Sequence, residues 1–113
     1  MTMTHTDVVR ACFTCYITQD RETAEKLYAE DFTLTSPQDD HIDRTAFFER
    51  CFPTAAALRS HELLEVVPTE SGEVIALYEY EKLSGERHRN AEVITLRDGQ
   101  LTEVQVFFGG PPR

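Results

Sequence analysis

The strongest constraint on the fold of this chain is the alternation of apolar and polar side chains through residues 61–108. Alternation of this kind places every second side chain on one face of a β-strand. Four runs show it, separated by short turn sequences: residues 61–67, 74–83, 87–96 and 101–108. The strongest turn signal is Asp98-Gly99, because this dipeptide readily adopts the positive φ angles of a tight hairpin. The C-terminal half is therefore predicted to form an antiparallel sheet.

The N-terminal half follows a helical period instead. Residues 6–17 carry apolar side chains at positions i, i+1, i+4, i+5, i+8 and i+9, which form one face of a helix. A second helix is predicted over residues 21–31, because Asp20 is a good N-cap residue. Residues 32–36 then alternate like a short strand, which Pro37 ends.

A third helix is predicted after the polar segment 38–43, which is interpreted as a loop. Either Asp43 or Thr45 is suited to cap this helix, and Pro53 ends or kinks it. Residues 54–60 are compatible with a further turn or two. The order is then helix, helix, short strand, helix and four strands. This order is typical of the α+β class, with helices on one side of an antiparallel sheet.

Length and charge narrow the classes of protein further. A chain of 113 residues predicts a single domain, 1–113, with one core. The formal net charge of −9 argues against nucleic acid and anionic membranes as partners, because no basic stripe exists to neutralise phosphates. No apolar run of about eighteen residues predicts a transmembrane helix. The N-terminus lacks the pattern of a secretory signal and the cysteine number is odd, so a cytoplasmic location is predicted.

Glu92 breaks the pattern of its strand, because the period of two places this carboxylate on the same face as Ile94. On a buried face, loss of hydration would raise its pKa, so that the group donates a hydrogen bond or relays a proton. The alternatives are an ion pair across the sheet with Arg87, Arg89 or Lys82, or simple exposure near an edge of the sheet.

Several other side chains suit a pocket wall. Asn90 shares the face of Glu92, where it either fixes a ligand carbonyl, orients Glu92 or simply ends a strand. Tyr16, Tyr78 and Tyr80 combine a large apolar ring with a polar tip. Plain core packing is the alternative for each of these tyrosines.

The sequence predicts neither a metal nor a cofactor. The segment 39–43 gathers three aspartates and His41, but its spacing matches no metal motif and is interpreted as a solvated loop with a helix cap. His41 is nevertheless a candidate acid or base at a pocket mouth. Cys12 and Cys15 form a C-x-x-C pattern in mid-helix, whereas redox motifs open a helix after a strand. The P-loop and the dinucleotide-binding glycine pattern are absent from the sequence.

Two stretches, DRETAEKLYAEDFTLTSP and AEVITLRDGQLTEVQVFFG, together with the order of elements resemble the nuclear transport factor 2-like superfamily. Within it, the chain looks most like the group of ketosteroid isomerases and SnoaL-like polyketide cyclases. The resemblance covers about residues 6–110. It implies a cone-shaped, curved mixed sheet wrapped around three N-terminal helices, an apolar pocket at the open end, and dimers that pack through the sheet. This fold hosts enzymes, transport factors and adaptor domains, so the resemblance alone does not fix a function.

The resemblance also implies roles for particular positions. In ketosteroid isomerases a general-base aspartate stands at the end of the first strand, just before a proline, and here that position is Ser36. An acid kept protonated on the penultimate strand corresponds to the position of Glu92 or its neighbour. The oxyanion tyrosine of the first helix corresponds to Cys12 by an ungapped count, with Tyr16 one turn later.

The resulting prediction is a small-molecule pocket protein with isomerase- or cyclase-like proton transfer on an apolar carbonyl compound. A serine does not shuttle a proton near neutral pH as a carboxylate does, so the acceptor is sought in Asp39, Asp40 or His41. The predicted catalytic residues are Glu92, Tyr16 and Asp40. The predicted ligand-binding residues are Tyr16, Phe32, Ser36, His41, Tyr78, Tyr80, Asn90, Glu92 and Phe108. The alternatives are a non-catalytic ligand-binding domain and a dimerising or protein-interaction domain.

Overall fold

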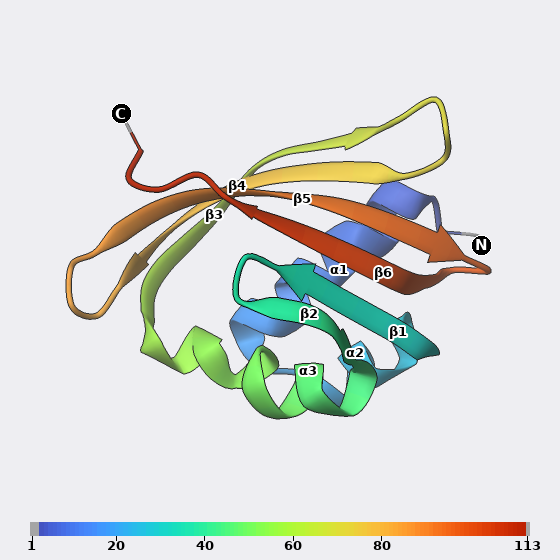
Figure 1. The fold of residues 1–113 in the computed structure, drawn as a ribbon, viewed down its shortest axis with the longest axis horizontal. Coiled ribbons are helices and arrows are strands. Elements are labelled where there is room, and N and C mark those ends of the chain that lie inside the picture. The colour runs from blue at the N-terminus through green and yellow to red at the C-terminus, as the bar shows by residue number, and fades with distance from the viewer. Residues whose placement is uncertain (1–2, 113) are drawn as a thin grey trace.

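The computed structural model describes residues 3–112 as a curved sheet that wraps around the helices without closing into a barrel (Figure 1). The helices are α1 (His5–Thr18), α2 (Arg21–Leu27), α3 (Arg44–Arg50) and the 3₁₀ helix η1 (Phe52–Ala57). The strands are β1 (Tyr28–Ser36), β2 (Asp39–Asp43), β3 (Leu58–Pro68), β4 (Val74–Lys82), β5 (Arg87–Arg97) and β6 (Gln100–Phe108). Their order is β2-β1-β6-β5-β4-β3, in which only the β1–β6 pair is parallel. The predicted α+β class, with a curved mixed sheet and three helices, is confirmed.

The first helix is fixed at both ends. The Thr4 hydroxyl accepts a hydrogen bond from the backbone of Asp7, and the Asp7 carboxylate accepts one from the backbone of Thr4, which is a capping box. Gln19 ends α1 in the left-handed region, with φ of 57°. The buried face of the helix consists of Val8, Val9, Cys12 and Cys15. α1 therefore presents Cys12 and its neighbours to the inside of the curved sheet.

The second helix is shorter than predicted, because residues 28–31 begin β1 instead. Tyr28 accounts for the difference. Its ring packs against Phe32, Phe47 and Phe48, with centroids 4.9, 4.8 and 5.4 Å away. This tertiary packing outweighs the local preference of the sequence for helix. The prediction of helix for residues 28–31 is therefore wrong.

The segment predicted as a loop between residues 38 and 43 is also different, because residues 39–43 form the edge strand β2. Its backbone pairs with β1 in antiparallel fashion. Most of its side chains are polar, so apolar alternation does not mark it, and backbone hydrogen bonds hold it in place. The pairing places Asp39 directly opposite Ser36. The polar segment thus folds back on the end of β1 rather than extending into solvent.

The chain after α3 differs from the prediction in a smaller way. α3 ends at Arg50, and the tighter 3₁₀ helix η1 follows, with Pro53 close to its beginning. Proline is tolerated in the first turn, where its missing N–H would have no partner in any case. β3 begins at Leu58, so residues 58–60 are strand rather than a continuation of helix.

The register of β4, β5 and β6 brings two rows of side chains to the inner face of the sheet. One row consists of Ala76, Glu92 and Val106, and the next consists of Tyr78, Asn90 and Phe108. Ile94 follows Glu92 on the same face and is buried. The period of two therefore places Glu92 inside the cone, as predicted.

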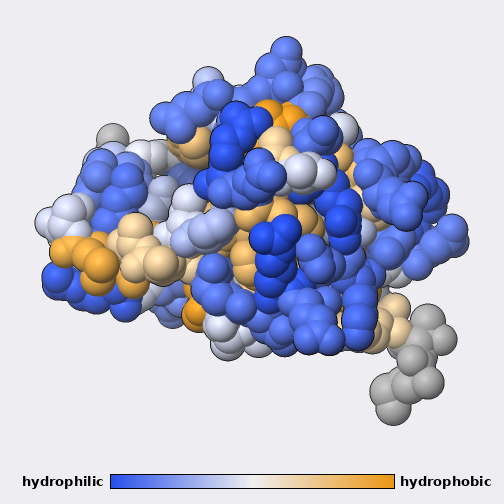
Figure 2. Space-filling model, turned by 90° about the horizontal axis from the view of Figure 1, so that it is seen from below, coloured by the Kyte–Doolittle hydropathy of each residue, from blue (hydrophilic) through white to orange (hydrophobic). Residues whose placement is uncertain are grey.

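On the side where α3 lies in Figure 1, the surface is mostly hydrophilic and apolar atoms emerge only in small areas (Figure 2). Part of this coverage comes from Arg21 and Arg44, whose guanidinium groups each lie 5.2 Å from the centre of the Phe48 ring. Such contacts are favourable because the ring face carries partial negative charge. None of the helices within residues 3–112 is long and apolar enough to cross a membrane.

The cap of α3 allows a direct test of the local structure. The Asp43 carboxylate accepts a hydrogen bond of 2.9 Å from the backbone of Ala46, so Asp43 and not Thr45 is the N-cap residue. We expect Asp43→Ala to lower the free energy of unfolding by about 1 kcal/mol, measured by urea denaturation. Thr45→Ala is the matched control and should change it by less than about 0.5 kcal/mol. An equal loss in both variants would contradict this assignment of the cap.

Candidate functional site

A cavity of about 620 Å³ lies between the inner face of the sheet, α1 and the segment formed by α3 and η1. Its inner part is lined by buried apolar side chains, among them Val9, Leu34, Ile94, Leu101 and Val104. Its rim is marked by lining residues that are exposed, namely Gln38, Arg50, Thr54, Ala57 and Phe108. The cavity is therefore largely apolar with a few polar side chains, and its rim includes the polar residues Gln38, Arg50 and Thr54, which is the usual organisation of a small-molecule site.

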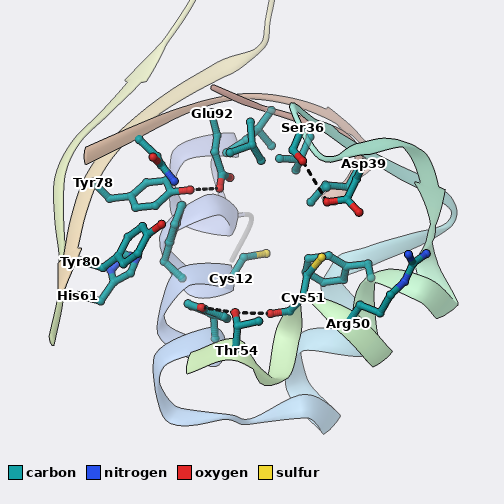
Figure 3. A pocket seen from close by; sticks show the side chains of 18 of the residues that line it. Cys12, Ser36, Asp39, Arg50, Cys51, Thr54, His61, Tyr78, Tyr80 and Glu92 are labelled. Carbon is teal, nitrogen blue, oxygen red and sulfur yellow. Dashed lines mark hydrogen bonds between the residues drawn. The ribbon is translucent and has the colours of Figure 1, made fainter. Parts of the chain in front are cut away.

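Glu92 and Tyr78 form the main polar pair of the cavity wall (Figure 3). The Tyr78 hydroxyl donates a hydrogen bond of 2.7 Å to Oε2 of Glu92. Burial raises the pKa of Glu92 to about 7, and the hydrogen bond from Tyr78 acts in the opposite direction. None of the ion pairs within residues 3–112 involves Glu92. The predicted alternative of a cross-strand pair with Arg87, Arg89 or Lys82 is therefore wrong.

The surroundings of Tyr78 keep its proton on the ring oxygen. Burial raises the pKa of Tyr78, and the charge of Glu92 raises it further. The Asn90 side chain beside it acts in the opposite direction. Asn90 is itself buried, and its Oδ1 accepts a hydrogen bond of 3.4 Å from the backbone of Gly109. Tyr78 thus remains a donor to Glu92 over the physiological pH range, and Glu92 is the group that titrates.

Tyr16 lines the cavity from α1, but its hydroxyl proton is already engaged. Thr54 donates its own hydroxyl to the carbonyl of Cys51 at 2.6 Å, so the 2.7 Å contact between the Tyr16 and Thr54 oxygens requires Tyr16 to donate. Burial raises the pKa of Tyr16. The tyrosine oxygen therefore faces the cavity as an acceptor, not as the free donor that an oxyanion partner must be.

Across the cavity from Tyr78, Ser36 and Asp39 form a second polar pair (Figure 3). The Ser36 hydroxyl donates to Oδ2 of Asp39 at 3.0 Å and accepts a hydrogen bond from the backbone of Gln38 at 3.1 Å. The antiparallel pairing of β1 with β2 brings this carboxylate back to the end of β1. A carboxyl group thus stands beside the serine, three positions further along the chain.

One wall of the cavity is aromatic. The rings of His61 and Tyr78 are stacked with centroids 5.0 Å apart, and Tyr80 lies 6.3 Å beyond Tyr78 in the same stack. Phe13 of α1 packs 5.6 Å from His61 and 5.3 Å from Tyr78. Burial lowers the pKa of His61, so its imidazole is neutral at neutral pH. This wall offers flat apolar surfaces without a permanent charge.

The thiols at the cavity are protonated at neutral pH. Burial raises the pKa of Cys12 to about 12 and also raises the pKa of Cys51. Cys15 of the C-x-x-C pattern is buried in the helix–sheet core. In the part of the chain that the structure describes, no three histidine, cysteine or acidic side chains converge as metal ligands would.

The structure brings most of the predicted site residues together and leaves three apart. The cavity is lined by Tyr16, Ser36, Tyr78, Tyr80, Asn90, Glu92 and Phe108. Phe32 lies outside the lining, because it is 1% exposed within the aromatic core. Asp40 and His41 also lie outside it, since the β-strand alternation turns Asp40 to solvent, where its side chain is 94% exposed and contacts His41 at 2.6 Å.

The predicted site does not include several polar lining residues, namely Gln38, Asp39, Arg50, Thr54, His61 and Lys82. The sequence indicates Asp39 only as one of three possible acceptors, because the polar sequence of β2 does not reveal its pairing. Arg50 and Thr54 come from the junction of α3 and η1, whose geometry depends on a 3₁₀ turn. His61 alternates with Leu63 along β3, and this alternation was the signal that could have assigned it to the inner face.

The raised pKa of Glu92 predicts a dependence of stability on pH. A carboxyl that is more basic in the folded state stabilises the fold below the pKa of the unfolded side chain, and this contribution is lost as pH rises through about 7. The compared quantity is the free energy of unfolding of Glu92→Gln minus that of the wild type. We expect this difference to be about 3 kcal/mol more favourable to the variant at pH 8 than at pH 4. Urea unfolding followed by circular dichroism at both pH values measures this.

Glu49→Gln is the control, because Glu49 is an exposed carboxylate of α3 away from the cavity lining. Its difference from the wild type should be the same at both pH values. A Glu92→Gln difference that also stays constant would contradict the raised pKa.

Comparison with known proteins bears on the fold. No family model matches the chain, and no curated protein sequence matches it. A protein from Kribbella flavida has a TM-score of 0.81 at 20% identity, over 90% of this chain and 84% of that one. A nuclear transport factor 2-like protein of unknown function from Cytophaga hutchinsonii has 0.73 at 20% identity, over 95% and 92%. A Sinorhizobium meliloti protein named a "putative polyketide cyclase" has 0.76 at 16% identity, over 88% and 93%.

Identities of 16% to 20% are informative for the fold alone. The agreement extends over 88% to 95% of this chain and 84% to 93% of these neighbours. The resemblance predicted from the sequence is thereby confirmed at the level of architecture. The chain has the nuclear transport factor 2-like fold.

Proposed function

We propose that this protein binds an apolar carbonyl compound in its cavity and catalyses proton transfer at the carbon next to the carbonyl. The observation that carries the proposal is the Glu92 carboxyl, which faces an apolar cavity and is hydrogen-bonded by Tyr78 at 2.7 Å. A buried acid with a pKa near 7 exchanges protons at neutral pH at little cost. The structural neighbour that is named a "putative polyketide cyclase" supports chemistry of this class.

In this proposal, Glu92 and Tyr78 act on the carbonyl oxygen of the ligand. With Tyr78 donating to Oε2, the protonated form of Glu92 carries its own proton toward the cavity and donates it to the ligand oxygen. This hydrogen bond strengthens as negative charge develops on that oxygen in the enolate-like transition state. Tyr16 is not assigned this role, because its proton is committed to Thr54.

Asp39 takes the basic side. Its carboxylate lines the cavity, and the Ser36 hydroxyl holds Oδ2 at 3.0 Å, which leaves Oδ1 available to the ligand. In this arrangement Ser36 orients the base instead of replacing it. The α-proton passes to Asp39 while the carbonyl oxygen is held by Glu92. Delivery of the proton to a conjugated carbon completes an isomerisation, whereas its return to the α-carbon only exchanges it.

Deuterium exchange tests this proposal. In D₂O, we expect the protein to accelerate deuterium uptake at the α-carbon of an apolar ketone such as 2-tetralone, followed by NMR. Glu92→Gln and Asp39→Asn should each lower the catalysed rate by about 100-fold, because each removes a group that moves or stabilises the proton. Asp40→Asn is the matched control and should retain the wild-type rate, since Asp40 faces solvent.

The alternatives predict different outcomes of the same experiment. If the ketone raises the melting temperature of the protein but no uptake above the solvent rate occurs, the cavity is a binding site without catalysis. If Asp40→Asn abolishes uptake and Asp39→Asn does not, the assignment of the base is wrong. If Glu92→Gln retains full activity, the electrophilic role of Glu92 fails.

We further propose that two copies of the chain associate through the outer face of the sheet. The side chains that alternate with the inner rows there include Ile75, Leu77, Ala91, Val93 and Phe107. Phe107 is 53% exposed and Ile75 is 41% exposed, which is unusual for large apolar side chains in the middle of a sheet. Glu79 and Arg89 form an ion pair at the border of this face. In a dimer with two-fold symmetry, the rim of the interface would therefore contain charges of both signs from each copy.

The oligomeric state tests the second proposal. We expect a dimer in sedimentation velocity at micromolar concentration, and a monomer for Phe107→Glu, because the substitution places a charge in the apolar centre of the interface. Ile17→Glu is the control, since Ile17 is a comparably exposed apolar residue on α1 rather than on the sheet. A monomeric wild type, or equal dissociation of both variants, would contradict the proposed interface.

A further inference from the structure

We propose that the ligand of this cavity carries an anionic group, which Arg50 binds at the mouth while the apolar part of the ligand fills the interior. This inference rests on the proposed binding of an apolar compound and specifies its chemical class as an amphipathic acid. Arg50 stands at the C-terminal end of α3, lines the cavity and is exposed at its rim. In Figure 3 its side chain extends along the side of the cavity where Asp39 lies, opposite His61 and Tyr80.

Arg50 differs from most arginines of the chain because its guanidinium is not engaged. Arg21, Arg59, Arg87, Arg89 and Arg97 each form an ion pair with a carboxylate. Arg44 donates to the backbone carbonyls of Glu25 and Tyr28. Within residues 3–112, no carboxylate lies within 4.0 Å of Arg50 and no hydrogen bond involves its side chain. A planar donor group at the mouth of a cavity is thus free to bind a ligand.

The charge of the cavity lining differs from that of the protein as a whole. The chain has a net charge of −9, whereas its cavity lining contains two cations, Arg50 and Lys82, and two carboxyl groups, Asp39 and Glu92. Lys82 forms an ion pair with Glu86 at 3.3 Å, so within the described residues Arg50 is the lining cation without a carboxylate partner. Glu92 itself is largely uncharged below its raised pKa of about 7. The lining is therefore close to neutral within an acidic molecule, and Arg50 offers an anion a positive charge at the mouth.

Interaction with the helix dipole is the other role open to Arg50, because a cation in the last turn of a helix is favourable. That role requires only that the charge stay near the end of α3, and it would affect stability regardless of the ligand. A role in ligand binding instead changes the affinity for anions and leaves the affinity for neutral compounds unaltered. The two roles are therefore separated by comparing an anionic with a neutral ligand of the same shape.

Two fluorescent probes provide this comparison. 8-Anilinonaphthalene-1-sulfonate and N-phenyl-1-naphthylamine share one apolar skeleton and differ by the sulfonate. We expect both to bind in the cavity, as judged by shifts of the backbone amide signals of β4 and β5 in ¹H–¹⁵N NMR, and the sulfonate to bind more tightly. Arg50→Gln should weaken binding of the sulfonate about tenfold through loss of a charge-assisted hydrogen bond and leave the neutral probe unchanged. Arg50→Lys should restore part of the loss.

Arg10→Gln is the matched control. Arg10 is likewise exposed, forms no ion pair within the described residues, and borders a separate hollow beside Phe13 and Ile17. A selective loss of the sulfonate in Arg10→Gln, or equal affinities of the two probes in the wild type, would overturn the assignment of Arg50 while leaving the cavity as a binding site. If neither probe shifts the cavity signals, the proposed binding of apolar compounds fails first.

Discussion

The aromatic cluster around Tyr28 is the constraint on which the rest of the structure depends. Tyr28 and Phe32 of β1 pack against Phe47 and Phe48 of α3 at centroid distances of 4.8 to 5.4 Å. Burial of each such ring contributes roughly 2 kcal/mol. The cluster fastens α3 to the sheet without occupying the centre of the cone. The space between α1 and β5 therefore need not be filled by side chains, and the fold tolerates both an open cavity and a carboxyl group within it.

The same cluster explains why parts of the fold were not predictable from the sequence. Residues 28–31 favour helix locally, and only the contacts of Tyr28 with residues nearly twenty positions away turn them into strand. β2 escaped prediction for a different reason, because an edge strand with polar side chains is held by backbone pairing and leaves no apolar period to detect. By contrast, the register of strands that bury one face, such as β4 and β5, can be predicted from the alternation of apolar and polar residues in their sequence.

In the candidate site, too, some positions were predictable from the sequence and others depended on tertiary pairing. The position of Glu92 inside the cone followed from the period of two along β5, because no register that buries Ile94 can expose Glu92 on the other face. The position of Asp39 depended on the hairpin between β1 and β2, which the sequence did not reveal. Asp40, one residue further on, is the predicted proton acceptor, and strand alternation turns it outward. A one-residue difference in a strand thus decides which carboxylate faces the cavity.

The proposed roles of Glu92 and Arg50 constrain each other through charge. When Glu92 is protonated, it can donate a hydrogen bond to the oxygen of a neutral carbonyl group. A ligand carboxylate at the same place would be repelled by Glu92 as Glu92 ionises near pH 7. The charge of an anionic ligand must therefore lie away from the inner wall. Arg50, at the end of α3, is the cation that lines the mouth of the cavity there. A carbonyl at one end and an acid at the other would orient a ligand in a single direction along the cavity. Orientation of this kind is what places one particular α-carbon, and not its neighbours, next to Asp39.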